Sequence, residues 1–362
     1  MIKLNINLGE RGYPIYITTD FGGLAKCIHS AGITGKLVLI TDSNVSGHQG
    51  GMCLESLKAA GLDAAVYIME AGEKNKNLDT VRDIYRFLLE QKLDRNSALM
   101  ALGGGVVGDI AGFAAATYLR GISFIQIPTS LLAQADSSVG GKVGVDFEGK
   151  KNLVGAFYQP RFVYMNVNTL RTLPAREMKS GLAEVIKHGI IRDPEFYEYI
   201  DYNIGKIYSF NEDVLQYLAK VNCSIKGRVV EEDEKENDLR AILNFGHTFG
   251  HGIESASGFR LYHGEAVSIG MVAACKLAYY MGMVEEELVN RVTGTLRKAG
   301  LPVSIGGLDL QTVYELMFHD KKARGGKLNF ILPQEIGRVI QCPVEDDGLI
   351  KQVLEEVLVP EA

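Results

Sequence analysis

The sequence predicts an α/β domain followed by a mainly α-helical domain. Short apolar runs alternate with helical periodicity in the first half of the chain, and a glycine-rich turn follows one of these runs. After about residue 173 the periodicity becomes almost entirely helical. Strands that alternate with helices indicate a parallel sheet with crossover helices. We therefore expect an α/β domain in residues 1–174 and a helical domain in residues 175–362.

The expected elements of the first half follow one another at short intervals. Residues 2–8 alternate in polarity and, after a glycine turn, residues 13–17 complete a β-hairpin. Further strands are expected at 36–41, 64–69, 97–102 and 122–127. Helices are expected at 45–60, at 78–92 and from the glycine run 103–105 to Arg120.

The second half has few candidate strands. Helical periodicity is present at 174–191, 213–232, 242–257, 264–281 and 285–299. Only residues 327–332 and 339–342 have the short apolar pattern of strands.

Bulk composition excludes several classes of protein. A net charge of −6 argues against a nucleic-acid partner, although a local cationic pocket can still bind an anionic small molecule. The five cysteines form no CxxC pair, and the start of the chain has no basic stretch followed by an apolar one. No apolar run reaches the length of a membrane span. We expect a cytoplasmic protein without disulfides and without a membrane partner.

A glycine pattern indicates a nucleotide-binding loop. Gly103, Gly105 and Gly108 fit GxGxxG between a predicted strand and a predicted helix, where backbone N–H groups can approach a pyrophosphate. A tightly packed strand-to-helix turn would need the same glycines. No acidic residue ends the next strand, whereas Asp42 ends an earlier one. Asp42 is therefore a candidate for the ribose hydroxyls if the two strands are adjacent, or else a helix N-cap.

Histidines cluster in one part of the second half. His247 and His251 are four residues apart and share one face if their segment is helical, and His263 follows shortly after. Two imidazoles and one carboxylate form a known zinc set that leaves one coordination position open. Glu184, in an earlier predicted helix, is a candidate carboxylate, although spacing does not connect it to the histidines. Buried or surface histidines without a metal remain the alternative.

Several cations stand beside glycines, polar turns or the histidine motif. Lysine and arginine bind phosphates and carboxylates, yet most lysines and arginines are simply solvated. The acidic run 231–238 is typical of a solvated helix end, or it holds one inward-facing general base. The candidate cations are Arg120, Lys142, Lys151, Lys187, Lys226, Arg240, Lys321 and Lys322.

Six longer segments carry these motifs in one order. They are GGGVVGDIAGFAAATYLRGI, IPTSLLAQADSSVGGKVGV, GKKNLVGAFYQP, TLPAREMKSGLAEVIKHG, LRAILNFGHTFGH and YHGEAVSIGM. Together they resemble the 3-dehydroquinate synthase family of sugar-phosphate cyclases, from Asp42 to Gly337. The resemblance implies a Rossmann-like variant N-terminal domain, a mainly helical C-terminal domain, catalytic NAD⁺, a divalent metal (zinc, with cobalt as an alternative) and a homodimer.

The resemblance also implies roles for individual residues. The metal ligands would be Glu184, His247 and His263. This set replaces the metal pair of His247 and His251 that spacing alone suggests. His251 would instead face the substrate phosphate. The NAD⁺ contacts would be Asp42, Glu73, Lys76, Gly104, Gly105, Val106, Asp109, Thr129, Ser130, Lys142, Lys151, Thr169 and Thr172. The substrate contacts would be Asp136, Asn152, Lys187, Lys226, Arg240 and one of Lys321 or Lys322. The catalytic residues would be Arg120, Lys142, Glu236, Asn244 and His251, with Glu236 at a position described as a proton acceptor.

The implied reaction converts 3-deoxy-D-arabino-heptulosonate 7-phosphate to 3-dehydroquinate and phosphate by transient oxidation, elimination, reduction and intramolecular aldol closure. Cyclases whose substrates lack the carboxylate, such as 2-deoxy-scyllo-inosose and valiolone-type synthases, would not need Arg240 with Lys226. An aminodehydroquinate synthase would keep both residues. A metal-dependent dehydrogenase of the glycerol type would release NADH and need no phosphate cluster. A binding protein without activity would leave so many convergent polar groups unexplained.

Overall fold

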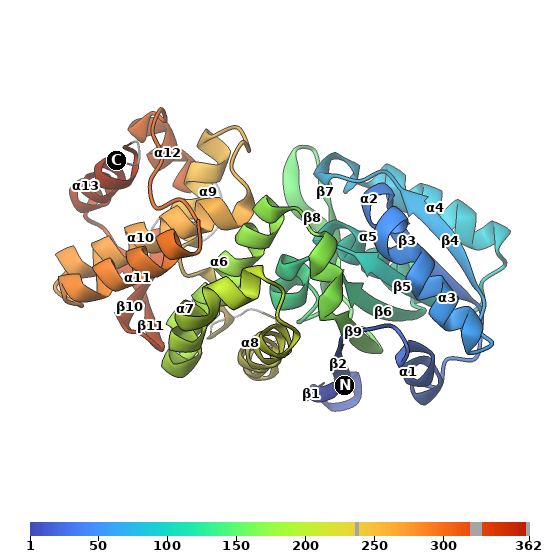
Figure 1. Ribbon diagram of the computed structural model, residues 1–362. Coiled ribbons are helices and arrows are strands. Elements are labelled where there is room, and N and C mark those ends of the chain that lie inside the picture. The colour runs from blue at the N-terminus through green and yellow to red at the C-terminus, as the bar shows by residue number, and fades with distance from the viewer. Residues whose placement is uncertain (236–238, 319–327, 360–362) are drawn as a thin grey trace. The chain divides into compact units, whose positions relative to one another are not determined.

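The computed structural model describes residues 1–235, 239–318 and 328–359, and its internal contacts divide the chain into two units (Figure 1). Unit 1 comprises Met1–Leu173 and Phe210–Glu231, and unit 2 comprises Pro174–Ser209 and Glu232–Ala362. The segment Phe210–Glu231, although it follows the expected boundary, thus belongs by its contacts to unit 1. That residues 1–174 and 175–362 form two separate domains stays a prediction.

Unit 1 is built on a seven-stranded sheet with the order β1-β2-β9-β6-β5-β3-β4. Its antiparallel pair is β1 with β2, and the other neighbours are parallel. The strands are β1 (Ile2–Ile6), β2 (Tyr13–Thr18), β3 (Leu37–Asp42), β4 (Ala64–Met69), β5 (Ala98–Gly103), β6 (Ser123–Pro128) and β9 (Phe162–Asn166). A separate antiparallel hairpin consists of β7 (Lys142–Phe147) and β8 (Lys150–Phe157).

Helices cover both faces of this sheet. Val38 and Ile40 of β3 belong to a core with helices α4 and α5, whereas Leu37 and Leu39 belong to a second core with α1 and α3. A strand buried on both faces has a continuous apolar sequence, which explains the run LVLI. The helices of unit 1 are α1 (Leu24–Ser30), α2 (Ser43–Val45), α3 (Gly51–Ala59), α4 (Leu78–Glu90), α5 (Gly105–Thr117) and α8 (Glu212–Glu232).

The strand order reverses between β3 and β5. From β3 the chain continues outward to β4 on one side, and from β5 it continues through β6 towards β9 on the other. The predicted adjacency of the strands that precede Asp42 and Gly103 is therefore confirmed, since Thr41 of β3 pairs with Leu102 of β5. Ligands of open α/β sheets bind at the carboxyl ends of strands at such a switch point.

Unit 2 is mainly helical. Its central helix, α10, has buried residues around most of its circumference, including Val267, Ile269 and Met271, as expected for a helix inside a bundle. It contacts α6, α9, α11 and α13. The helices are α6 (Ala175–Arg192), α7 (Pro194–Tyr208), α9 (His247–Ala256), α10 (His263–Tyr280), α11 (Glu286–Lys298), α12 (Leu310–Met317) and α13 (Asp347–Val357), and the hairpin strands are β10 (Leu328–Glu335) and β11 (Arg338–Val344).

The predicted fold class, an α/β part followed by a helical part, is confirmed. One expected helix, 242–257, is interrupted, because the 3₁₀ turn Leu239–Asn244 ends before Gly246, whose φ of 79° is left-handed. The predicted helix 45–60 likewise begins with a short π-helical turn, Ser46–Gly50. Across the described ranges, no helix is both long and apolar enough to span a membrane.

Candidate metal and nucleotide sites

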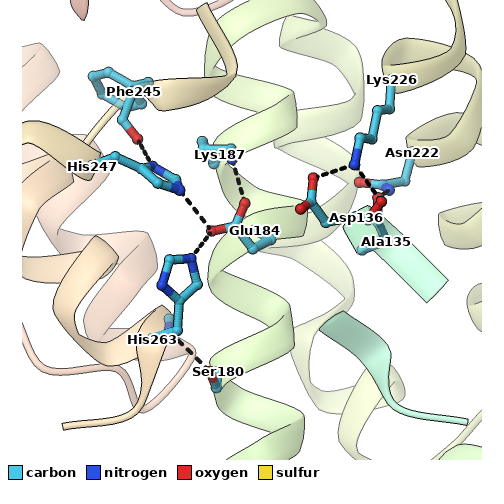
Figure 2. Close-up of polar contacts among 11 residues, drawn as sticks. Ala135, Asp136, Ser180, Glu184, Lys187, Asn222, Lys226, Phe245, His247 and His263 are labelled. Atoms are coloured by element: carbon cyan, nitrogen blue, oxygen red, sulfur yellow. Dashed lines mark hydrogen bonds and ion pairs between the residues drawn. The ribbon is translucent and has the colours of Figure 1, made fainter. Parts of the chain in front are cut away.

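Helix α6 carries two buried ionisable residues on one face. Glu184 and Lys187 are 1% exposed and three residues apart, so their side chains lie on adjacent turns of the same face. Lys187 Nζ donates to Glu184 Oε2. This pairing satisfies one carboxylate oxygen, and the other, Oε1, is directed to the histidines of α9 and α10 (Figure 2).

The two histidines present the same ring atom to Glu184. His263 Nε2 lies 3.4 Å from Glu184 Oε1, and His247 Nε2 lies 3.8 Å from the same oxygen (Figure 2). Both histidines are the first residues of their helices, α10 and α9. The three ligand atoms all lie within 4.8 Å of one another. The structure therefore brings together the set Glu184, His247 and His263 that the resemblance implied.

The opposite ring nitrogens face other acceptors. His247 Nδ1 lies 3.1 Å from the carbonyl oxygen of Phe245, and His263 Nδ1 lies 3.7 Å from Glu254 Oε2. An acceptor at Nδ1 favours the tautomer whose Nε2 lone pair is available to a metal. Sequence reasoning missed Glu254, whose position three residues after His251 on a predicted helix was the available signal.

The chemistry of this cluster fits a divalent metal. Glu184 Oε1 is buried and receives no well-aligned hydrogen bond within the described part of the chain. A buried carboxylate oxygen left in that state is unfavourable. Two imidazole nitrogens and one carboxylate oxygen are a donor set that zinc uses when it keeps a position open for substrate.

Electrostatics within the cluster separates the two histidines. Burial lowers the pKa of His247, and the neighbouring Lys187 lowers it further. Burial also disfavours the charged form of His263, but the carboxylates of Glu184 and Glu254 outweigh it and raise its pKa to about 9. Burial opposes ionisation of Glu184, yet Lys187 and the histidines hold its pKa well below its usual range. The cluster thus favours an ionised carboxylate beside positive charge.

His251 lies next to the cluster without joining the Glu184 set. Its ring centroid is 5.3 Å from that of His247 and 6.1 Å from that of His263. It forms a second potential ligand group with Glu254 and His263. The two histidines that share the Glu184 carboxylate are therefore His247 and His263, and not the spacing-based pair of His247 and His251.

In unit 1, candidate nucleotide residues end three adjacent strands. Asp42 ends β3, Gly104 and Gly105 follow β5, and Thr129 and Ser130 follow β6. A Cβ on Gly105 would lie 3.2 Å from Ser137 Oγ, so a side chain there would crowd the turn, whereas one on Gly104 would make an ordinary contact of 3.4 Å with Ser130 Oγ. Gly105 and Val106 open α5, whose first N–H groups point out of the helix. This edge is suited to a pyrophosphate.

Asp42 has the N-cap role that the sequence left open. Its Oδ1 accepts hydrogen bonds of 2.9 Å from the backbone N–H groups of Asn44 and Val45. A carboxylate has a second oxygen, so the cap does not preclude contact with a ribose hydroxyl.

Lys76 connects several candidate residues of unit 1. Its Nζ lies 2.6 Å from Asp109 Oδ2 and 3.9 Å from Glu73 Oε1, and it donates to Asn152 Oδ1 at 2.5 Å. The backbone N–H of Asp146 donates to the Lys76 carbonyl at 2.8 Å, which ties the β7–β8 hairpin to this loop. Burial raises the pKa of Asp109 to about 6, and Lys76 limits the rise.

Helix α8 holds the π-helical turn Ala133–Ser137 by its side chains. Lys226 Nζ donates to Asp136 Oδ1 at 2.7 Å and also to the Asp136 carbonyl, while Asn222 Nδ2 donates to the Ala135 carbonyl at 2.6 Å (Figure 2). Two predicted substrate residues, Asp136 and Lys226, are therefore in direct contact. Asn222 was not predicted, because a buried amide on a helix has no distinctive spacing.

Thr169 and Thr172 lie in the 3₁₀ turn Val167–Thr172 at the end of β9. Thr169 Oγ1 accepts from Gln134 Nε2 at 3.2 Å, and Thr172 Oγ1 accepts from Gln49 Nε2 at 3.0 Å. Both threonines are thus in unit 1, at the same strand ends as the glycine loop.

The remaining candidates divide between the two units. Arg120, Lys142 and Lys151 are exposed in unit 1, and Arg120 has a φ of 65° after Leu119 at 50°. Arg240 and Asn244 lie in the same 3₁₀ turn of unit 2, Leu239–Asn244. Arg240 is buried, and its Nη1 donates to the Glu234 carbonyl at 2.7 Å. Glu236, Lys321 and Lys322 lie outside the described residues.

Comparison with known proteins gives matches along most of the chain. A family model described as 3-dehydroquinate synthase N-terminal matches residues 66–180, and one described as 3-dehydroquinate synthase C-terminal matches residues 181–323. A 3-dehydroquinate synthase of Acetivibrio thermocellus is 63% identical over 355 residues, which cover 98% of this chain and 99% of that protein.

Solved structures of two sugar-phosphate cyclases share the fold. A 2-deoxy-scyllo-inosose synthase complexed with carbaglucose-6-phosphate, NAD⁺ and Co²⁺ is 28% identical, with a TM-score of 0.88 over 99% of this chain and 100% of that one. A 2-epi-5-epi-valiolone synthase from Streptomyces hygroscopicus with NAD⁺ and Zn²⁺ bound is 25% identical, with a TM-score of 0.88 over 95% of this chain and 96% of that one. The two family models and the 63% identity over 98% of its length show that this chain belongs to the 3-dehydroquinate synthase family.

Proposed function

We propose that this chain is an enzyme that converts 3-deoxy-D-arabino-heptulosonate 7-phosphate to 3-dehydroquinate and phosphate, a lyase step of aromatic amino acid biosynthesis. One observation carries the proposal: in a chain of this family, His247 Nε2 and His263 Nε2 both face Glu184 Oε1. Among the described residues this buried oxygen has no hydrogen-bond donor. The enzyme's cofactors are NAD⁺ and a divalent metal; the imidazole and carboxylate donors suit Zn²⁺, with Co²⁺ as the alternative.

When bound, NAD⁺ would supply reversible hydride transfer, and the metal would supply a Lewis acid for a substrate hydroxyl. Glu184, His247 and His263 would hold the metal. The strand ends of unit 1 would hold NAD⁺, with the α5 N-terminus at the pyrophosphate and Asp42 at a ribose. The further NAD⁺ contacts in the proposal are Glu73, Lys76, Asp109, Thr129, Ser130, Lys142, Lys151, Thr169 and Thr172.

The phosphate of the substrate requires cations and hydrogen-bond donors fixed in place before the reaction. We assign this role to Arg120, Lys142, Asn152, Asn244 and His251. Asn152 accepts a hydrogen bond from Lys76 Nζ, and this supports the assignment because the bond orients the amide of a residue with a positive φ of 53°. Groups of this kind would hold a phosphate in position for elimination.

The carboxylate of the substrate is assigned to Lys226 and Arg240. Asp136 already neutralises Lys226 within unit 1, so a substrate carboxylate would share that ammonium with Asp136. Lys187, held against Glu184, would contact the substrate near the metal. Glu236 as proton acceptor and one of Lys321 or Lys322 as a substrate contact complete the proposed set.

The same two residues argue against carboxylate-free sugar phosphates as substrates, because such substrates offer no carboxylate to Arg240 and Lys226. An aminodehydroquinate synthase would use both residues and therefore needs a direct substrate test. A homodimer in the cytoplasm is part of the proposal. The homodimer rests on the family resemblance.

The test is phosphate release from 3-deoxy-D-arabino-heptulosonate 7-phosphate with NAD⁺ far below the substrate concentration. Many phosphates per NAD⁺ and no net absorbance of NADH are expected, because the hydride is returned. A chelator should abolish release, and zinc or cobalt should restore it. Parallel assays with the aminated analogue and a carboxylate-free sugar phosphate rank the alternatives. Net NADH accumulation, or no release by the metal-loaded protein, would refute the proposal.

A further inference from the structure

The first turns of α6 and α10 are joined by a two-pronged ion pair. Arg176 Nε donates to Glu265 Oε1 at 2.7 Å, and Arg176 Nη2 donates to Glu265 Oε2 at 2.6 Å. A guanidinium that engages both carboxylate oxygens fixes orientation as well as distance, which a lysine ammonium does not. Each helix of this pair also carries a residue of the candidate metal set, Glu184 on α6 and His263 on α10.

The same arginine contacts the chain on the approach to α10. Arg176 Nη2 donates to the Arg260 carbonyl at 2.8 Å, and its guanidinium carbon lies 4.0 Å from the ring centroid of Tyr262. Tyr262 N–H in turn donates to Glu265 Oε2 at 2.8 Å. Arg176 therefore holds the residues on both sides of His263, the first residue of α10.

A close backbone approach fixes the two helices beside this ion pair. Gly264 N–H donates to Ser180 Oγ at 2.9 Å, so the side chain of one helix satisfies an unpaired N–H of the other (Figure 2). A Cβ at Gly264 would lie 2.0 Å from the Ser180 carbonyl oxygen. Ser180 is one turn before Glu184 on α6, so this contact sets the distance between the two helices at the level of the metal set.

We infer that Arg176 is a positioning residue for the metal centre, and this inference rests on the proposed function. By clamping Tyr262 and Glu265 onto α6, Arg176 fixes where His263 Nε2 stands relative to Glu184 Oε1. Arg176 touches neither the metal ligands nor the proposed substrate residues in any contact described above. Its effect passes through the register of the two helices.

The exposure of Arg176 limits how much this ion pair contributes to folding. The Arg176 side chain is 48% exposed and that of Glu265 is 13% exposed. Exposed pairs generally add little to the free energy of unfolding, and the two-pronged geometry places this pair at the upper end of their range. Loss of Arg176 should therefore change the metal centre more than it changes the stability of the metal-free protein.

The experiment compares Arg176→Gln, Arg176→Lys and a matched control, Lys276→Met. Lys276 forms an ion pair with Glu356 that joins α10 to α13, and it lies 13 residues after His263, about 20 Å along the helix. Zinc affinity is measured by competition with a chelating dye on the full chain. The visible absorption of bound Co²⁺ reports the ligand geometry, and thermal unfolding of the metal-free protein reports stability.

We expect Arg176→Gln to weaken zinc binding roughly tenfold or more and to alter the Co²⁺ spectrum. Arg176→Lys should weaken zinc binding to an intermediate extent, because a single ammonium cannot hold both Glu265 oxygens in a fixed orientation. Lys276→Met should keep the zinc affinity and the Co²⁺ spectrum of the unmodified chain. Its unfolding midpoint without metal should change about as much as that of Arg176→Gln.

Two results overturn the inference in different ways. If Arg176→Gln matches Lys276→Met in zinc affinity and Co²⁺ spectrum, the clamp does not position the metal centre, and the proposed function stands. If the unmodified chain binds no zinc or cobalt, the metal centre of the proposed function fails and the inference fails with it.

Discussion

Lys76 and Asp109 form an ion pair beside the glycine loop, with 2.6 Å between Nζ and Oδ2. The two side chains are 6% and 17% exposed. Burial raises the pKa of Asp109 from 3.8 to about 6, and the charge and hydrogen bond of Lys76 oppose that rise. The ammonium of Lys76 therefore keeps Asp109 ionised at neutral pH.

Replacement of Lys76 by Met should raise the pKa of Asp109 above about 6, because the group that lowers it is removed. Asp109 binds its proton more tightly in the folded chain than in the unfolded one, so its contribution to the free energy of unfolding falls as pH rises from 3.8 to about 6. In Lys76→Met that fall should extend to higher pH. The measurement is carboxyl ¹³C NMR, assigned with Asp109→Asn.

Lys74→Met is the control for this titration, because Lys74 is an exposed cation in the same loop. It should leave the Asp109 midpoint unchanged. A midpoint in Lys76→Met that equals the control would mean that the ion pair does not govern Asp109.

Replacement of His263 by Ala should lower the bound zinc well below that of the unmodified chain, because one of the three proposed protein ligands is lost. Elemental analysis after dialysis against limiting zinc measures this. His29→Ala is the control, since His29 lies on α1 of unit 1, with Nδ1 2.7 Å from the Ala25 carbonyl oxygen of the same helix. Equal zinc content in both variants would remove His263 from the ligand set.

Glu254 should matter for metal affinity through His263 Nδ1, which lies 3.7 Å from its carboxylate. Glu254→Ala should weaken zinc binding by roughly 10–100-fold, the range for residues that orient a metal-bound histidine. Glu254→Gln should lose less, because the amide keeps an acceptor oxygen facing His263 Nδ1. Dye competition measures both, with Ser255→Ala as the control. Identical affinities for Ala and Gln would contradict an acceptor role.

The expected strands and their order of appearance follow from local apolar runs, and the sheet accordingly contains every strand predicted for the first half. The hairpin of β7 and β8 was not predicted, because strand β8 contains glycine, lysine and asparagine and is largely exposed. The break before α9 was also not predicted, since the left-handed Gly246 interrupts a segment whose periodicity is otherwise helical.

The candidate site was harder to predict than the fold. Spacing alone favoured His247 with His251, because two residues four apart share a helix face. The shared oxygen of Glu184 instead faces the first residues of two different helices, His247 and His263. Their proximity depends on how α6, α9 and α10 pack, which no local pattern reveals. The resemblance supplied that information through whole motifs.

Substitutions at Asp42 should separate its cap from its proposed contact with NAD⁺. Asp42→Asn keeps an oxygen for the N–H groups of Asn44 and Val45, so the unfolding free energy should hardly change. Asp42→Ala should lose about 1 kcal/mol. Both variants should bind NAD⁺ roughly tenfold more weakly, since a charged acceptor for ribose hydroxyls is lost. Calorimetric titration and thermal unfolding measure the two effects; unchanged NAD⁺ affinity in Asp42→Asn would leave the residue as a cap only.

Arg240 should decide the preference for a carboxylated substrate. Arg240→Ala should weaken binding of 3-deoxy-D-arabino-heptulosonate 7-phosphate by roughly 10–100-fold, the value of a charge-assisted hydrogen bond, and leave the NAD⁺ affinity nearly intact. The residue is buried and donates to the Glu234 carbonyl, so thermal unfolding must first confirm that the variant folds.

A carboxylate-free sugar phosphate makes the Arg240 prediction sharper. The unmodified chain should bind it weakly, and Arg240→Ala should bind it no more weakly than the unmodified chain does, because the missing interaction is the same one. The loss of the Arg240 side chain and the loss of the substrate carboxylate should therefore have non-additive effects on binding, as expected for two groups that contact each other. Additive losses, or equal losses of NAD⁺ and substrate affinity, would mean that Arg240 supports the fold of unit 2 and does not bind the carboxylate.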